Sequence, residues 1–251
     1  MPGCLYKAEK FTAQAGNTSV CGLHFEHLLY LSLLSQVDKF HLVGQGPVPV
    51  GSRLMKKRGS EVLYYNGNEV YSSSNGAGLD FFLIERATQT PIGIEAKNIR
   101  EWVYPWDLEV WRMLAKAATL ECLPVLIARK LSYLTLKFFS EVGGLGFQSH
   151  FQYFDESVKP LFGDVIRTDG LGFADIKFDM TPPSHFAKFL SGTLPANAST
   201  QFAKFRANLS LVRRYAIDEG LAEDSLGSRM RPKLFKEFTQ ELGFSADESS
   251  L

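Results

Sequence analysis

The sequence has few of the features that mark secreted, membrane-bound or disulfide-rich proteins. Its 251 residues include three cysteines, Cys4, Cys21 and Cys122, which are odd in number and form no CxxC pair. A disulfide framework or a cysteine-based zinc site is therefore not expected. No apolar run reaches the roughly 18 residues that a transmembrane helix needs, and no basic-then-apolar leader occurs. These absences predict a cytoplasmic protein.

The sequence also lacks an excess of either positive or negative charge. Lysine and arginine together number 27, and aspartate and glutamate together also number 27, so the formal net charge is zero. A polyanionic partner would then need a local basic surface, because no global field attracts it. The chain is rich in apolar residues: 45% of its residues are hydrophobic and 20 are phenylalanine. This content is ample for a large core.

The apolar pattern predicts an α/β domain. Leucine spacing indicates a helix over residues 23–38, and Asn66-Gly67 between two β-rich runs predicts a type I′ hairpin. The further elements expected, in chain order, are strands at 79–84 and 92–96, a helix at 105–121, a buried strand at 124–128, a helix at 133–142 and short strands near 151–154 and 164–178.

The composition changes after Met180. The stretch TPPSHFAKFLSGTLPANAST is rich in proline, serine, threonine and alanine, and it has no strand pattern. Pro182-Pro183 is the expected boundary. From residue 201 onward the apolar spacing is helical. The predicted organisation is therefore a domain at residues 1–180 and a helical C-terminal extension at residues 181–251.

Three charged residues stand at the edges of two apolar runs. Asp80 opens one run, and Glu95 and Lys97 close the next. A hairpin that turns near Thr88 places Asp80 across from residues 95–97, because paired positions in an antiparallel hairpin sum to a constant. Side-chain alternation puts Glu95 and Lys97 on one face. Two converging carboxylates repel each other unless a cation lies between them, and oxygen donors suit Mg²⁺ or Mn²⁺.

The pattern D-x14-E-x-K across a hairpin, followed by a helix and a buried strand, resembles the PD-(D/E)xK nuclease superfamily. It is most similar to the restriction-endonuclease-like proteins and the archaeal Holliday-junction resolvases. The matching residues are Asp80 in GLDFFL and Glu95, Ala96 and Lys97 in EAK, while Leu79 replaces the proline of the motif's name. The resemblance covers about residues 22–154. It implies a three-layer α/β/α restriction-endonuclease-like core with a central mixed sheet in the order αβββαβ.

The resemblance also implies roles for the residues. Asp80, Glu95 and the carbonyl oxygen of Ala96 would hold one or two Mg²⁺ or Mn²⁺ ions, and Lys97 would position or help deprotonate the attacking water. Glu26 in LHFEHLL matches a glutamate that related proteins carry in an N-terminal helix. The implied activity is metal-dependent endonuclease cleavage of DNA. A junction or other branched structure, a flap, a duplex sequence and a single strand are all compatible substrates. RNA is the alternative polymer, and a homodimer is expected because two nicks require two sites.

The tripeptide E-x-K is common, so a surface salt bridge is the alternative for the motif. A second spacing of the same kind, Asp164, Asp175 and Lys177, is disfavoured because prolines and a loop follow it. For Glu26 the alternative is a solvated helix face. A different class of function is a nuclease fold without catalysis that binds nucleic acid or assembles a larger complex. The presence of both acids and the lysine argues against that class.

Basic and aromatic residues outside the motif are candidate nucleic-acid contacts. For each lysine or arginine the alternative is a solvated surface, and for each tryptophan it is core packing. An exposed Trp102 or Trp106 could instead stack on an unpaired base. The basic candidates are Lys116 on the polar side of the expected helix at 105–121, and Lys56, Lys57 and Arg58 in RLMKKRG.

Overall fold

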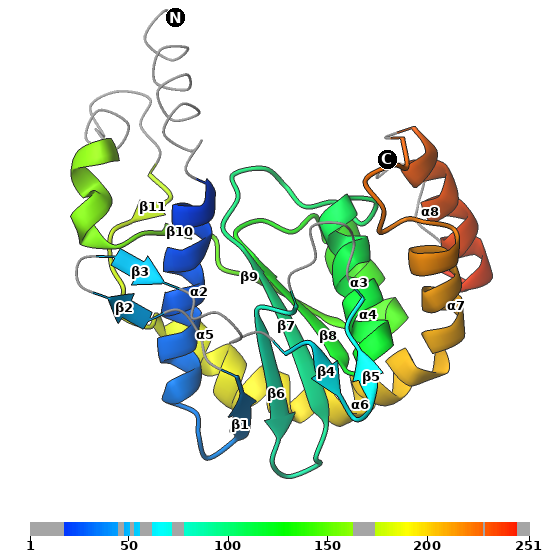
Figure 1. Ribbon diagram of the computed structural model, residues 1–251, viewed down its shortest axis with the longest axis horizontal. Helices are drawn as coiled ribbons and strands as arrows, with labels where there is room; N and C mark the ends of the chain where they lie inside the picture. Colours follow the sequence, from blue (N-terminus) through cyan, green and yellow to red (C-terminus); the bar gives the residue numbers. More distant parts are fainter. Residues whose placement is uncertain are drawn as a thin grey trace, which may run out of the picture.

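A mixed five-stranded sheet forms the centre of the computed structural model, which describes residues 18–44, 48–50, 53–55, 62–71, 78–162, 174–227 and 229–244. The strand order is β1-β6-β7-β8-β9 (Figure 1). The first three strands are antiparallel neighbours, and β7, β8 and β9 run parallel. The strands are β1 (Phe40–Val43), β6 (Phe81–Glu85), β7 (Pro91–Lys97), β8 (Leu123–Ala128) and β9 (Leu145–Gln148).

Helices cover both faces of this sheet. Helix α2 (Thr18–Leu34) packs on one face together with α5 (Ser184–Lys188), and α3 (Leu108–Leu120) and α4 (Tyr133–Val142) pack on the other. Because strand side chains alternate, the neighbours Phe81 and Phe82 belong to different apolar clusters on opposite faces. The expected α/β class with a mixed central sheet is confirmed.

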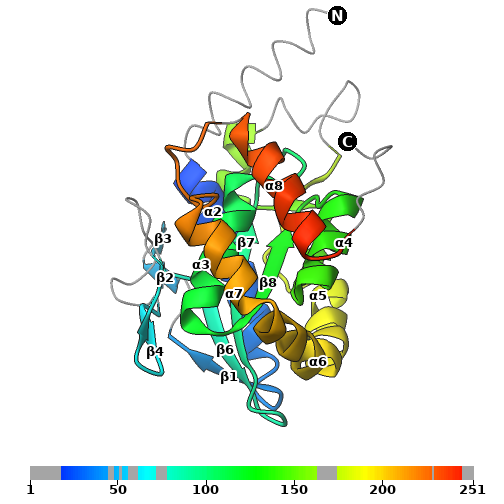
Figure 2. The same ribbon diagram turned by 90° about the vertical axis from the view of Figure 1, so that its right-hand side faces the viewer.

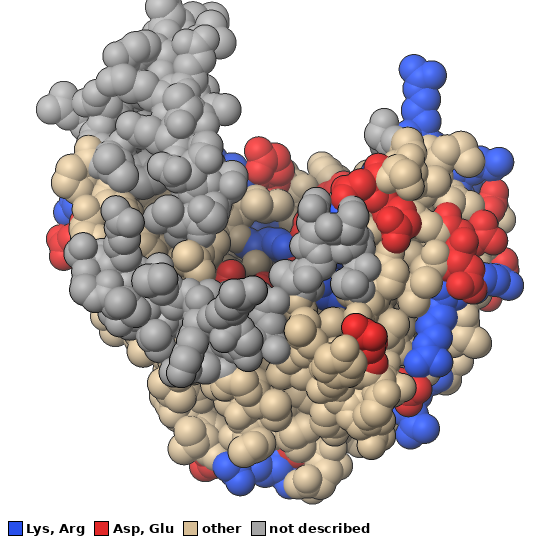
Figure 3. All heavy atoms as spheres, in the orientation of Figure 1, with Lys and Arg blue, Asp and Glu red and all other residues tan. Residues whose placement is uncertain are grey.

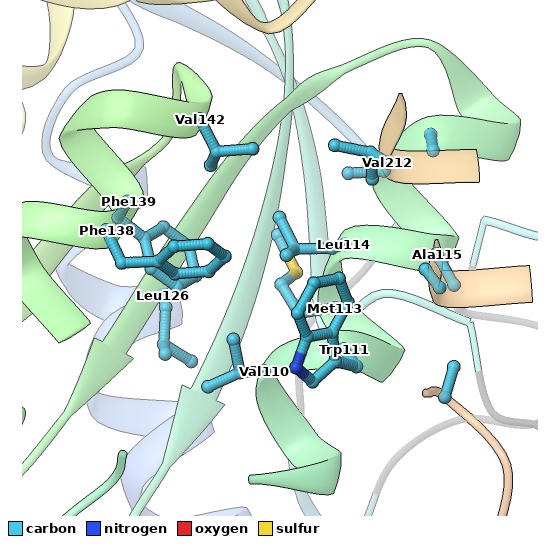
Figure 4. Packing of buried hydrophobic residues seen from close by; sticks show 14 of the residues in the cluster. Val110, Trp111, Met113, Leu114, Ala115, Leu126, Phe138, Phe139, Val142 and Val212 are labelled. Atoms are coloured by element: carbon cyan, nitrogen blue, oxygen red, sulfur yellow. The ribbon is translucent and has the colours of Figure 1, made fainter. Parts of the chain in front are cut away.

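Trp111 anchors the cluster on the α3 and α4 face (Figure 4). It is fully buried, and its ring contacts Phe138 of α4 and Phe238 of the C-terminal helix α8 (Met230–Glu241). Burying one large apolar side chain of this kind contributes about 1.5–3 kcal/mol. These contacts fix α3 against α4 and α8, which matters because α3 carries charged residues of the candidate site.

Helices α7 and α8 lie across the outer side of α3 and α4 (Figure 2). Val212 of α7 and Phe235 and Phe238 of α8 share the cluster with α3, while Leu194 and Ala198 of α6 join the cluster on the α2 face. None of the helices in the described ranges has the length and apolar character needed to span a bilayer. The helical segments are α6 (Leu194–Ala207), α7 (Leu209–Arg213), α8 (Met230–Glu241), and the π-helical η2 (Phe189–Thr193) and η3 (Arg214–Asp218).

Three small sheets flank the centre. Asn66 and Gly67 join two strands with φ of 50° and 82°, as a type I′ turn requires, so the expected hairpin is confirmed. The pairs are β2 (Val48–Val50) with β3 (Arg53–Met55), β4 (Tyr64–Tyr65) with β5 (Asn68–Glu69), and β10 (Gln152–Tyr153) with β11 (Ile176–Lys177). A 3-10 helix, η1 (Glu156–Phe162), follows β10.

Several expected boundaries were wrong. The first helix ends at Leu34 and not at residue 38, because the chain turns over residues 35–39 to enter β1, an edge strand that was not expected. Helix α3 begins at Leu108, three residues after Pro105, since Asp107 accepts a hydrogen bond from the backbone of Tyr104 and closes a turn there.

Two further expectations near glycine and proline were also wrong. Helix α4 ends at Val142 as predicted, with Gly143 as its cap, but strand β9, which begins at Leu145, was not expected. Helical structure in the C-terminal part begins at Ser184 and not near residue 201. Pro195 lies in the first turn of α6, directly after the π-helical η2.

Replacing Gly143 by alanine is expected to lower the free energy of unfolding by more than about 1–2 kcal/mol, the cost of a left-handed conformation for a residue with a Cβ. Gly143 has φ of 95°, and an added Cβ would lie 2.2 Å from the backbone nitrogen of Phe205. Urea unfolding measures the change. Gly192→Ala is the control, because its Cβ meets nothing within 4 Å and alanine favours a helix. Equal effects of the two substitutions would contradict this account.

Candidate active site

The motif residues lie at the ends of the neighbouring strands β6 and β7. Phe81 pairs with Ile94, so continuing the register places Asp80 opposite Glu95. The backbone N–H of Ala96 donates a hydrogen bond to Oδ2 of Asp80 at 2.8 Å. The hairpin therefore brings Asp80 to the strand segment that its spacing predicted.

Glu95 is a buried carboxylate held by two lysines. Its side chain is 6% exposed, and Nζ of Lys97 lies 2.9 Å from Oε1. Nζ of Lys116 lies 3.2 Å from Oε2 and donates a second hydrogen bond to the carbonyl oxygen of Gly78 at 3.0 Å. Because Lys116 belongs to α3, this contact ties the helix to the strand that carries the motif.

The charges continue across α3 as an alternating chain. Nζ of Lys97 also lies 2.7 Å from Oε2 of Glu109, in the first turn of α3. Arg112 is 3.6 Å from Oε1 of Glu109 and 2.5 Å from Oδ2 of Asp224. A network of ion pairs thus extends from the end of β7 to the segment between η3 and α8, and a cation lies between each pair of acids.

These neighbours shift the pKa values of the two central residues in opposite directions. Burial by itself raises the pKa of Glu95, but the ammonium groups of Lys97 and Lys116 outweigh it and hold that pKa well below its usual range. Burial lowers the pKa of Lys97, but Glu95, Asp80 and Glu109 outweigh it and raise that pKa. Both residues are therefore ionised at neutral pH.

The oxygen donors at this place are of the kind that Mg²⁺ prefers. The N–H and C=O of a strand residue lie on the same edge, so the carbonyl oxygen of Ala96 points toward the Asp80 side. Within the described residues, however, no group of three His, Cys, Asp or Glu side chains is arranged to hold a metal ion. The positive charge beside Glu95 is supplied by Lys97 and Lys116, so a metal there would share that carboxylate with two lysines.

The remaining candidates are distributed differently. Glu26 is partly exposed on α2, which lies against β7 on the face opposite α3. Glu26 therefore belongs to a different layer of the fold than Lys116 does. The alternative prediction for Lys116, a solvated surface position, was wrong. Its side chain is 11% exposed and is bound to Glu95. Lys56, Lys57 and Arg58 lie outside the described residues.

The competing acid at Asp175 has a structural partner. Its carboxylate accepts hydrogen bonds from Arg100, at 3.2 Å, and from Arg129. Arg129 is 1% exposed, and burial lowers its pKa to about 10, so Asp175 compensates a buried guanidinium. Nζ of Lys177 lies 4.8 Å from the ring centroid of Phe151, and Asp164 lies outside the described residues.

Sequence inspection did not identify Arg129. Its only local signal is that it directly follows β8, whose six residues are all buried. A charged residue at the end of such a run has to find a buried counter-charge or reach solvent. Its partner Asp175 lies 46 residues away, so the pairing depends on how the chain folds back.

The molecular surface is hollowed between the part that carries α2 and the part that carries α8 (Figure 3). Basic and acidic side chains both line this hollow. No protein-family model, curated protein or solved structure matches the chain.

Proposed function

We propose that the protein is a metal-dependent nuclease that resembles the PD-(D/E)xK enzymes and hydrolyses phosphodiester bonds in DNA. The observation that carries the proposal is the convergence of Asp80, Glu95 and Lys97 at adjacent strand ends, joined by the hydrogen bond from Ala96 to Asp80. A surface salt bridge does not need a buried glutamate or a second acid on the neighbouring strand. Perturbed ionisable groups gathered at strand ends are typical of catalytic sites.

The order of elements supports the same proposal. The strands β2 to β5 lie between β1 and β6 and form two separate small sheets. When only the central sheet and its covering helices are counted, the chain order is a helix (α2), three antiparallel strands (β1, β6 and β7), a second helix (α3) and a parallel strand (β8). This order agrees with a three-layer restriction-endonuclease-like core. The motif lies on the second and third of these strands, and the second helix, α3, contributes Glu109 and Lys116 beside it.

Asp80, Glu95 and the carbonyl oxygen of Ala96 would hold Mg²⁺ or Mn²⁺. The bound ion would lower the pKa of a water molecule and neutralise charge on the scissile phosphate. The Ala96 N–H orients the Asp80 carboxylate. Glu109 and Glu95 keep Lys97 as an ammonium ion, which favours a role in positioning water and stabilising negative charge over a role as a base.

The proposal also includes a role for Glu26, a branched DNA substrate and a homodimer. Glu26 is proposed to orient the water or contact a second ion. A branched DNA substrate and a homodimer with two sites follow from the resemblance to junction resolvases. Lys116 contacts a phosphate only if its ammonium group leaves Glu95 and Gly78, to which it is bound in this structure.

A second candidate function is a nuclease-like module that binds nucleic acid or assembles a larger complex without catalysis. The observation that favours it is the pair of ammonium groups on Glu95, one on each side of the carboxylate. With Lys97 and Lys116 in place, this carboxylate is neutralised without a metal ion.

Cleavage assays separate the two candidates. The full chain is incubated with end-labelled junction, flap, duplex and single-stranded DNA and with RNA, in Mg²⁺, in Mn²⁺ and in chelator. We expect cleavage of DNA that requires the metal and is lost in Asp80→Asn. Asp38→Asn is the control, because the Asp38 side chain is 67% exposed and remote in sequence from the motif. Binding of these substrates without any metal-dependent cleavage would support the non-catalytic module.

A further inference from the structure

The segment that follows β7 exposes aromatic side chains near the candidate site. Trp102 is 47% exposed, Tyr104 is 39% exposed, and Tyr133 at the start of α4 is 76% exposed. Trp111 is fully buried and Trp106 is partly buried. Core packing thus accounts for Trp111 but leaves the faces of Trp102, Tyr104 and Tyr133 in contact with solvent.

Backbone pairing between two segments holds Trp102 and Tyr104 outward. The N–H of Val103 donates to the carbonyl of Lys130 at 3.0 Å, and the N–H of Ser132 donates to the carbonyl of Val103 at 3.0 Å. Val103 and Leu131 form a parallel bridge, and each is 1% exposed. Because side chains alternate along extended chain, the neighbours of these two core residues face solvent.

The exposed rings are supported from behind and from the side. The ring of Tyr104 stacks on Trp106 at 5.2 Å with an interplanar angle of 6°, and Trp106 meets the edge of Phe235 of α8. Nζ of Lys130 lies 5.3 Å from the ring centroid of Trp102, a cation–π distance. Rings held in this way lose little conformational entropy when a ligand stacks on them.

Positive charge accompanies these rings. Lys130 forms no ion pair with any residue that the structure describes. Its pKa is lowered by burial and then by Arg129 and Arg100, which both bind the carboxylate of Asp175 and also lie near Glu101. An anionic ligand would relieve this repulsion. The N–H of Arg129 also donates to the carbonyl of Lys97, so this surface adjoins the proposed active site.

We propose that Trp102, Tyr104 and Tyr133 form a stacking platform for unpaired bases of a nucleic-acid strand, with Lys130 contacting its phosphates. Aromatic rings beside cations suit single strands, because every base offers a π face and the backbone is anionic. The bases of an intact duplex are already stacked and cannot use such rings. The inference builds on the proposed nuclease function and adds that the substrate carries an unpaired segment beside the cleaved bond.

Binding measured without metal tests the platform independently of cleavage. Fluorescence anisotropy in chelator compares a labelled single-stranded DNA, the same sequence as RNA, and a blunt DNA duplex. We expect a single strand to bind more tightly than the duplex, and the two single-stranded arms identify the polymer. Trp102→Ala and Tyr133→Ala should each weaken single-strand binding about 5- to 100-fold, the effect of losing one stacked base. Trp102→Phe should restore most of the affinity.

Tyr64→Ala is the matched control, because Tyr64 is 64% exposed on the separate β4–β5 hairpin. It should change single-strand affinity less than twofold. Unchanged binding by both Trp102→Ala and Tyr133→Ala, or equal affinity for duplex and single strand, would overturn the platform. The protein could also fail to cleave any substrate while these variants lose the preference for single strands. That result would support the platform and contradict only the nuclease proposal.

Discussion

Lys97→Met is expected to slow metal-dependent DNA cleavage by about 10²- to 10³-fold, the usual effect of removing one group that stabilises transition-state charge. The ammonium group of Lys97 lies within 2.9 Å of Glu95 and 2.7 Å of Glu109, so methionine removes the charge at the centre of the motif while keeping the length of the side chain. Single-turnover cleavage at saturating enzyme gives the rate of the chemical step without a contribution from product release.

Two further lysine variants make this result specific. Lys177→Met removes an exposed strand lysine from the competing D-x-K spacing and should leave the rate unchanged. Lys116→Met removes the other ammonium group on Glu95 and should slow cleavage less than Lys97→Met does. If Lys97→Met cleaves at the unmutated rate while Lys177→Met is inactive, the assignment of the motif is wrong.

Glu95→Gln is expected to lower the free energy of unfolding by about 3–5 kcal/mol, as happens when one partner of a buried ion pair is removed. The substitution leaves Lys116, whose side chain is 11% exposed, with a backbone carbonyl and a neutral amide in place of a carboxylate. Urea unfolding at neutral pH in chelator measures the loss. Glu109→Gln is the control, because Glu109 is 38% exposed and its pairs should contribute less than about 1 kcal/mol.

The effect of Glu95→Gln should also depend on pH. The pKa of Glu95 is lowered from 4.5 to about 2, so the unfolded chain takes up a proton before the folded protein does. The carboxylate therefore stabilises the fold fully above pH 4.5, and this contribution is lost as the pH falls toward about 2. The stability difference between the unmutated protein and Glu95→Gln should shrink across that range. A difference that stays constant would contradict the paired, ionised state of Glu95.

Local signals predicted much of the fold that positions the site. Asn66-Gly67 fits only a few turn types, and the start and end of α4 follow from Ser132 as a cap and Gly143 in a left-handed conformation. The approach of Asp80 to the strand segment around Ala96 followed from the position of the turn alone. In each case the interacting residues belong to one turn, one helix or one hairpin.

The charge balance of the site was not predictable in the same way. The sequence suggested a metal ion beside the converging acids, whereas the structure places the ammonium group of Lys116 against Glu95 across 21 residues of chain. That contact exists because the apolar face of α3 packs on the sheet and turns Lys116 inward. The short strands β1 and β9 were also missed, since each is only four residues long and is ordered mainly by its pairing with a neighbouring strand.

The sequence by itself therefore determined the main helices and strands, the hairpin of the motif and the three charged residues that it brings together. Only the tertiary structure decided which cations accompany Glu95, which arginines bind Asp175, and which of the three tryptophans remains most exposed. The reason is that hydrogen bonds within a turn or hairpin act over a few residues. Burial and ion pairing depend on which elements pack against each other, and no short stretch of sequence contains that information.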